Sequence, residues 1–132
     1  MPRYVIRESE VARYHPANHT GTSNRRVIGP ETVGAKQVEV LIGTIEKKQG
    51  ALPHAHPGIE QVGYMLAGTA EVEIGLGDAK EVSQVQTGDT IFFPADVFHK
   101  FTVTSDEPVR LLVIYAPPYL EQTHNVIREQ PK

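Results

Sequence analysis

The chain has 132 residues, with 13 Lys and Arg against 16 Asp and Glu, a formal net charge of -3 at pH 7 and no cysteine. This length suits a single domain, and the lack of cysteine excludes disulfides, zinc–thiolate sites and thiol catalysis. Any metal site must therefore use His, carboxylate or amide ligands, and the nearly balanced charge argues against a nucleic-acid partner.

The N-terminal segment, residues 1–35, is polar and has no strong hydrophobic period apart from a strand signal at Val27 and Ile28. We expect an arm that belongs to the same domain. Its stretch 14–29 carries His19 and Arg25. Either a lid over a substrate or a solvated dimer arm would explain this composition, and we favour the dimer arm.

Nothing in the chain predicts a membrane partner. The first residues lack the apolar run of a secretory signal, and no stretch approaches the roughly 18 apolar residues that a membrane span needs. We therefore expect a cytoplasmic protein.

Residues 36–117 carry short runs rich in Val, Ile, Phe, Tyr and Thr between Gly- and Pro-containing turns, which predicts an all-β sandwich or barrel. Adjacent apolar residues in VEVLIG (38–43) and RLLVIY (110–115) indicate strands covered on both faces, by a second sheet or by a partner subunit. The predicted strands are Lys36 to Glu46, Gln61 to Ala67, Ala70 to Ile74, Ser83 to Val85, Thr90 to Phe93, His99 to Val103 and Val109 to Tyr115.

Residues 118–132 are predicted to form a tail or a short helix. Pro117 and Pro118 precede it, and proline suits the first turn of a helix.

Two histidines, His54 and His56, lie two positions apart in HAHPGIEQVGYMLAG, residues 54–68. In an extended segment such side chains project from the same face, so both imidazoles could bind one ion. Neutral imidazole is the commonest metal ligand in proteins. Taken alone, however, the pair is equally compatible with two polar loop histidines.

The sequence resembles a single-domain cupin in two separate motifs. The first cupin motif, G(X)5HXH(X)3,4E(X)6G, is matched, with a gap of three after the first glycine, by Gly50, His54, His56, the Glu60/Gln61 pair and Gly68. The second, G(X)5PXG(X)2H(X)3N, is matched by Gly88, Pro94 and His99, while Asp96 and Val103 replace its later glycine and its asparagine. Asp96 leaves the turn before His99 less certain.

The resemblance implies a double-stranded β-helix, the RmlC-like jelly-roll barrel, usually as a homodimer. It also implies one divalent metal ion held by three histidines and a fourth ligand, which puts His54, His56 and His99 at the ion. Zn, Mn, Fe, Ni and Co all tolerate nitrogen and oxygen ligands, so the metal stays open. The alternative for His99 is a hydrogen-bonded core side chain.

The fourth ligand is either Glu60 or Gln61, since both fit the spacing after His56. Six residues separate the ligand from Gly68 only when the ligand is Gln61. Strand alternation places Gln61, Gly63, Met65 and Ala67 on one face, although Val62, Tyr64 and Leu66 make the other face more apolar. We predict Gln61, because a cavity needs the room that small residues leave. Some metal cupins, including those that resemble the uronate-converting proteins of pectin degradation, carry a Glu-Gln pair here with glutamine as the ligand.

Further residues are candidates for the site. A general base could be Glu60, His19 or Tyr64. Phe101 is the favoured pocket residue because it lies two positions beyond His99 and so on the same face. The full set of pocket candidates is Met65, Phe93, Phe101, Tyr115 and Arg25.

The resemblance favours a metal-dependent enzyme acting on a small oxygen-rich organic substrate. Its chemistry would be that of a Lewis-acid isomerase or lyase, or that of a dioxygenase. The alternative is a non-catalytic cupin that binds a small sugar, acid or metal. No helix-turn-helix segment is evident, which argues against a DNA-binding regulator.

Overall fold

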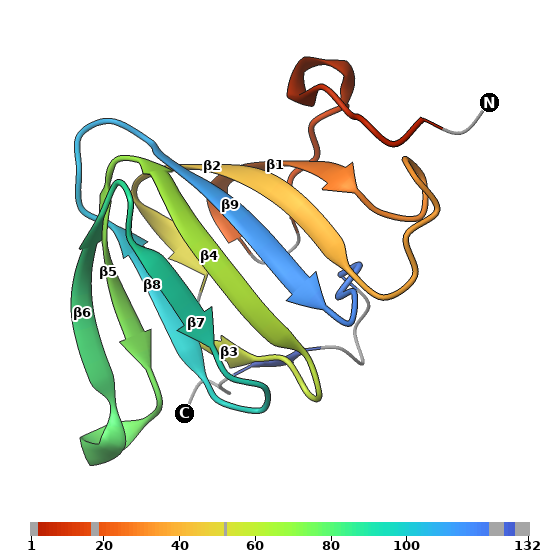
Figure 1. The fold of residues 1–132 in the computed structure, drawn as a ribbon. Coiled ribbons are helices and arrows are strands. Elements are labelled where there is room, and N and C mark those ends of the chain that lie inside the picture. Colours follow the sequence, from red (N-terminus) through yellow and green to blue (C-terminus); the bar gives the residue numbers. More distant parts are fainter. Residues whose placement is uncertain (1–2, 17–18, 52, 122–125, 129–132) are drawn as a thin grey trace.

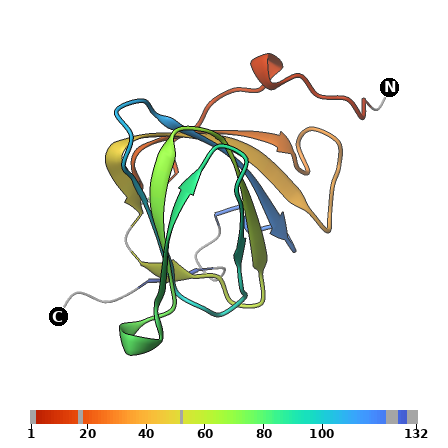
Figure 2. The same cartoon turned by 60° about the vertical axis from the view of Figure 1, so that its left-hand side comes forward.

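In a computed structural model, the chain forms two five-stranded antiparallel sheets that wrap around a common core (Figures 1 and 2). The structure describes residues 3–16, 19–51, 53–121 and 126–128, and only the backbone of residues 19, 20, 48, 50, 51 and 128. The fold is the all-β jelly roll that the strand spacing and the cupin motifs predicted.

The first sheet has the strand order β1-β2-β9-β4-β7 and the second β10-β3-β8-β5-β6. The first consists of β1 (His19–Ile28), β2 (Glu39–Ala51), β9 (Val109–Ala116), β4 (Glu60–Ala67) and β7 (Thr90–Phe93). The second consists of β10 (Ile127–Arg128), β3 (His54–Ala55), β8 (His99–Val103), β5 (Thr69–Ile74) and β6 (Glu81–Gln86). Two 3₁₀ helices, η1 (Glu8–Glu10) and η2 (Gly77–Ala79), complete the elements of the described residues.

Period-two alternation builds the core between the sheets. In β4, Gln61 and Met65 are buried while Tyr64 and Leu66 are exposed, so the face with the small residues points inward as predicted. In β9 every second residue from Val109 to Tyr115 is buried. The buried hydrophobic core includes Leu41, Ile45, Ile59, Met65, Val72, Ile91, Phe93, Val103, Val109, Leu111 and Val113.

β7 and β8 begin and end at the predicted residues, but β1 is much longer than predicted. We expected a strand only at Val27 and Ile28, whereas residues 19–28 pair with β2 along the edge of the first sheet. The missing signal has a physical cause. Two inward side chains of this strand, Thr22 and Asn24, are polar although buried, so the strand lacks apolar alternation.

The C-terminal segment contains no helix in residues 117–121 or 126–128. Residues 120 and 121 form part of a turn, and β10 pairs with β3 next to His54. Residues 122–125 lie outside the described part of the chain, so the predicted short helix is not tested there.

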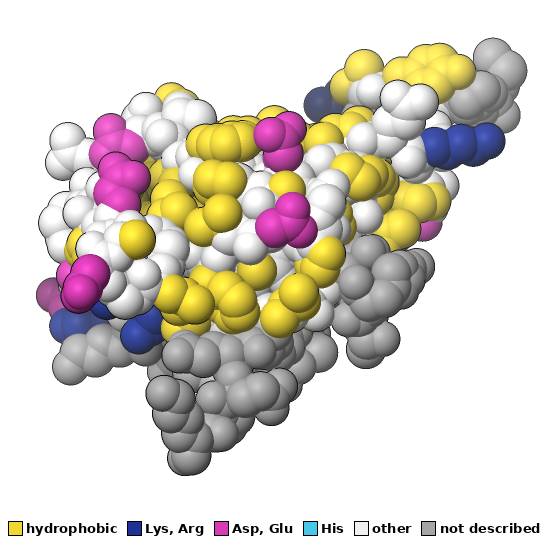
Figure 3. Space-filling model, turned by 90° about the horizontal axis from the view of Figure 1, so that it is seen from below, with side chains coloured by type: hydrophobic (Ala, Val, Ile, Leu, Met, Phe, Trp, Pro, Cys, Tyr) yellow, Lys and Arg dark blue, Asp and Glu magenta, His cyan; other side chains and the backbone are white. Residues whose placement is uncertain are grey.

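No helix among the described residues has the length and hydropathy needed to cross a membrane. Figure 3 shows the molecule from below the view of Figure 1. On this face hydrophobic side chains are widespread, and the Lys and Arg side chains lie at its edges. This face therefore has no concentration of positive charge for a polyanion.

Candidate metal centre

Three buried histidines meet between β3 and β8. His54 lies in β3 and pairs with His99, the first residue of β8, while His56 follows β3. The ring centroids of His54 and His99 are 4.4 Å apart, and His56 lies 5.0 Å from His54 and 5.4 Å from His99. One nitrogen from each ring lies within 4.8 Å of the others, so the three could hold one metal ion.

The turn at Asp96 joins the two motifs that provide these histidines. Asp96 has φ +68°, a left-handed conformation that aspartate tolerates better than most non-glycine residues. Its backbone N–H donates to the carbonyl oxygen of His56 at 3.1 Å, and its Oδ1 accepts from the backbone N–H of Gly58 at 3.1 Å. Aspartate therefore forms the turn where the cupin motif has glycine, and ties it to the loop that follows His56.

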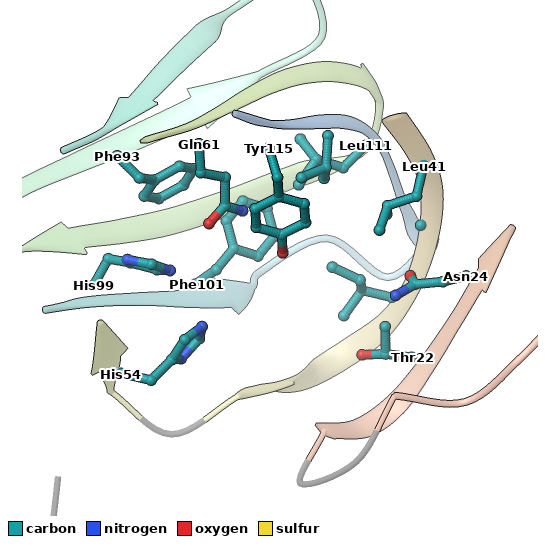
Figure 4. Close-up of a pocket in the computed structure, with 13 residues that line it drawn as sticks. Thr22, Asn24, Leu41, His54, Gln61, Phe93, His99, Phe101, Leu111 and Tyr115 are labelled. Carbon is teal, nitrogen blue, oxygen red and sulfur yellow. The ribbon is translucent and has the colours of Figure 1, made fainter. Parts of the chain in front are cut away.

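Gln61 could provide a fourth metal ligand beside the three histidines. Its side chain is buried, and Oε1 has no hydrogen-bond partner among the described residues. Figure 4 shows this oxygen on the side of the amide that faces His99 and His54. A buried acceptor without a partner is costly, and a metal ion would remove that cost. Three imidazoles and an amide oxygen form a donor set that fits a divalent first-row metal.

A cavity of about 70 Å³ adjoins His54, His99 and Gln61. Thr22 and Asn24 are polar residues on the opposite side from the histidines (Figure 4). The other walls are mostly hydrophobic, and their apolar side chains are Leu41, Ile45, Phe93, Phe101, Leu111 and Val113.

Gly43 lines this cavity, and Gly63 lies behind its lining residue Leu111. A Cβ atom on Gly43 would lie 2.8 Å from Oδ1 of Asn24, and one on Gly63 would lie 3.3 Å from Leu111 Cδ1. A larger residue at Gly43 would therefore displace Asn24. Gly63 leaves space beside Leu111, as expected for the inward face of β4.

Tyr115 places a hydroxyl group in the cavity (Figure 4). Burial, and secondarily the negative charge of Glu39, raise the pKa of Tyr115 well above 10. The hydroxyl thus stays protonated at neutral pH and can donate a hydrogen bond to a ligand oxygen. Its ring centroid lies 5.5 Å from that of His56.

Tyrosine ionisation provides a test of this burial. Burial also raises the pKa of Tyr14, against the opposing effect of Arg26. We expect ultraviolet titration to show fewer than the five tyrosinates of the unfolded chain at about pH 11. Because the folded state keeps protons that the unfolded state loses, stability should fall as pH rises above 10. Ionisation of all five tyrosines near pH 10 before unfolding would contradict this prediction.

The structure places the other predicted site residues as follows. Phe93, Phe101 and Tyr115 line the cavity. Met65 does not line it and is fully buried in the hydrophobic core. Arg25 points away from the cavity, since it alternates with the inward Asn24, and its NH1 lies 3.4 Å from Glu8 Oε2.

Two of the three predicted base candidates, Glu60 and Tyr64, do not lie on the cavity wall. Glu60 and Tyr64 are exposed, because strand alternation turns them to the outer face of β4, opposite to Gln61. The backbone of His19 begins β1, but its side chain lies outside the described part of the structure.

The sequence analysis missed the polar wall formed by Thr22 and Asn24. It also missed Tyr119, whose ring centroid lies 4.4 Å from that of His56. Nothing in their sequence context distinguishes these residues from loop residues, and only the pairing of β1 with β2 brings the first two to the cavity.

The fold and the site define a small jelly-roll protein with a buried histidine cluster beside a cavity. The model of the cupin domain family matches residues 41–115, more than half of the chain, so the chain belongs to the cupin family.

The chain is also similar to two proteins in sequence and to one solved structure in fold. The chain is 29% identical to Protein SchB of Streptomyces halstedii over 102 residues, 77% of this chain and 71% of that protein. It is 24% identical to polyketide synthase CurC of Streptomyces cyaneus over 117 residues, 89% of this chain and 73% of that protein. The solved structure of the polyketide cyclase RemF from Streptomyces resistomycificus superimposes with a TM-score of 0.76 at 20% identity, covering 100% of this chain and 88% of that one.

Proposed function

We propose that this cupin is a metal-dependent enzyme that activates a small substrate with carbonyl or hydroxyl oxygens by Lewis-acid chemistry. The observation that carries the proposal is the buried donor set of His54, His56, His99 and the partnerless Gln61 Oε1 beside a cavity. A divalent ion held there would supply Lewis acidity toward a carbonyl oxygen. Four neutral donors would leave its charge of +2 undiminished.

The chain's own groups define what the substrate must provide. The Tyr115 hydroxyl can donate to a second substrate oxygen, and the apolar walls limit water around the reacting atoms. No carboxylate is among the described residues that line the cavity. The cavity therefore suits a substrate that loses a carbon-bound proton readily, which favours a 1,3-dicarbonyl compound.

The names of two relatives support this substrate class, since CurC is called a polyketide synthase and RemF a polyketide cyclase. Polyketide chains consist of repeated 1,3-dicarbonyl units. In a cyclisation of such a chain, a C–H bond between two carbonyl groups gives up its proton, and that carbon forms a C–C bond to another carbonyl carbon. The oxygen of that carbonyl then takes up a proton.

Deuterium exchange tests the first step. Zinc-loaded protein is expected to accelerate exchange at the carbon between the carbonyl groups of ethyl acetoacetate, and His99→Ala at equal free zinc should not. Exchange at the background rate by fully zinc-loaded protein would overturn the proposal in favour of the non-catalytic binding cupin. Oxygen uptake with iron-loaded protein, without accelerated exchange, would overturn it in favour of a dioxygenase.

The choice between Gln61 and Glu60 as fourth ligand can be tested with a matched pair of variants. Gln61→Ala is expected to weaken zinc binding by at least about tenfold, because it removes a donor atom next to the histidines. Glu60→Ala should leave binding unchanged, since Glu60 is exposed on the opposite face. Competition with a chromogenic chelator measures both affinities, and a loss confined to the Glu60 variant would reverse the assignment.

We further propose that the protein is a homodimer formed through the outer face of the first sheet. Phe92 and Tyr64 are 51% and 41% exposed. Phe92 pairs with Val62, and Tyr64 with Leu112, so these four side chains form a continuous apolar face across β7, β4 and β9. A second copy presents the same apolar patch and could cover it. Light scattering should find a dimer that Phe92→Glu dissociates, and a monomeric wild-type protein would overturn the proposal.

A further inference from the structure

Glu39, the first residue of β2, has a completely buried carboxylate. It does not line the cavity. Its Oε2 accepts a hydrogen bond from Nε of Arg26 at 2.5 Å. Its Oε1 accepts from the backbone N–H groups of Tyr119 and Leu120, both at 3.0 Å. A buried carboxylate is costly unless it is paired and hydrogen-bonded, and Glu39 satisfies both conditions.

Arg26 is itself fixed by three further contacts. Its NH1 donates to Glu31 Oε2 at 2.9 Å, its NH2 donates to the Tyr14 hydroxyl at 3.3 Å, and its guanidinium carbon lies 4.9 Å from the centre of the Tyr14 ring. The position of the Glu39 carboxylate is thus set by β1, which carries Arg26, as well as by its own strand.

The segment that Glu39 holds is strained. Leu120 and Glu121 have φ values of +50° and +55°, a left-handed conformation that costs about 1–3 kcal/mol for a residue with a Cβ atom. Such a turn directs successive N–H groups to one side and forms a concave anion site. The Glu39 carboxylate occupies that site and so stabilises the turn.

The same turn carries Tyr119 to the candidate metal centre. Its side chain is buried, and its ring centroid lies 4.4 Å from that of His56 and 5.2 Å from that of Tyr115. A contact of this kind restricts rotation of the imidazole and excludes water from it. Glu39 therefore reaches the histidine cluster through two backbone hydrogen bonds and one aromatic contact.

We propose that Glu39 is a positioning residue that holds Tyr119 against His56 and thereby sets the orientation of that imidazole for metal binding. The inference rests on the proposed metal-binding function. Groups that orient metal ligands typically affect affinity by 10- to 100-fold when removed, which sets the expected scale here to about tenfold or more.

The test compares Glu39→Gln with Glu31→Gln. Both changes remove a charged partner of Arg26, but only Glu39 contacts the turn at residues 119 and 120. Two measurements apply: the NMR shifts of the His56 ring protons without metal, which sense the ring current of Tyr119, and a cobalt(II) titration followed by visible absorption.

We expect Glu39→Gln to move the His56 ring resonances, to weaken cobalt binding by about tenfold or more, and to change the cobalt spectrum. Glu31→Gln should leave all three unchanged. Tyr119→Leu should reproduce the effects of Glu39→Gln. Tyr119→Phe, which keeps the aromatic ring, should bind cobalt with the affinity of the wild-type protein. If Glu39→Gln fails to fold, the Tyr119 variants keep the inference falsifiable, because the proposed route from Glu39 to His56 passes through the Tyr119 ring.

Unchanged His56 resonances and cobalt affinity in folded Glu39→Gln, or in Tyr119→Leu, would overturn the inference. A wild-type protein that binds no cobalt would instead overturn the proposed function. In that case the metal-free NMR comparison still decides whether Glu39 positions Tyr119, so the two failures are distinguishable.

Discussion

His99→Ala is expected to yield a folded protein that no longer retains a divalent metal through purification. The change removes one of three imidazoles whose donor atoms lie within 4.8 Å of one another. A Lewis acid contributes several kcal/mol to catalysis and each 1.36 kcal/mol is tenfold, so activity should fall by about 10³-fold or more. Elemental analysis and the deuterium-exchange rate measure the two effects.

Lys100→Ala is the matched control for His99→Ala. Lys100 is the next residue of β8 and points away from the histidines, with its Nζ 4.0 Å from Glu73 Oε2. Its loss should change neither metal content nor exchange rate, because an exposed ion pair contributes little. A His99→Ala protein with one tightly bound metal per chain would show that the three histidines do not form the site.

The histidine cluster was predicted partly from local geometry and partly from the resemblance to the cupin motifs. His54 and His56 project together from an extended segment, whereas His99, which pairs with His54 in the structure, was assigned to the site by its match to the second motif. Gln61 followed from a residue count, and its burial agrees with that choice. Alternation alone would have predicted the wrong face of β4 to be buried, because its outer face carries more large apolar side chains than its inner face.

The remaining parts of the site depend on long-range pairing, which a local pattern does not contain. Asn24 reaches the cavity only because β1 pairs with β2, where it lies opposite Gly43. Glu39 and Tyr119 are 80 positions apart and meet through a backbone hydrogen bond. In the sequence, Glu39 has the appearance of an ordinary surface residue at the start of a strand, and its partners only emerge from the fold.

Gly68→Ala is expected to cause a large loss of stability, although it adds only one carbon atom. Gly68 closes the first cupin motif at the turn between β4 and β5, with φ +84°. A Cβ atom there would lie 2.9 Å from Val109 Cγ2 and 3.0 Å from Val109 Cα. The second contact is with backbone, which cannot move aside as a side chain would.

Gly88→Ala separates the two causes of that loss. Gly88 also has a left-handed conformation, φ +96°, but a Cβ atom on it would meet no atom within 4 Å. It should therefore incur only the backbone strain, about 1–2 kcal/mol. Gly68→Ala adds the steric conflict with the buried Val109, for a total of about 3 kcal/mol or more. Urea unfolding of metal-free protein measures both, and equal losses would mean that backbone conformation alone requires glycine in the first motif.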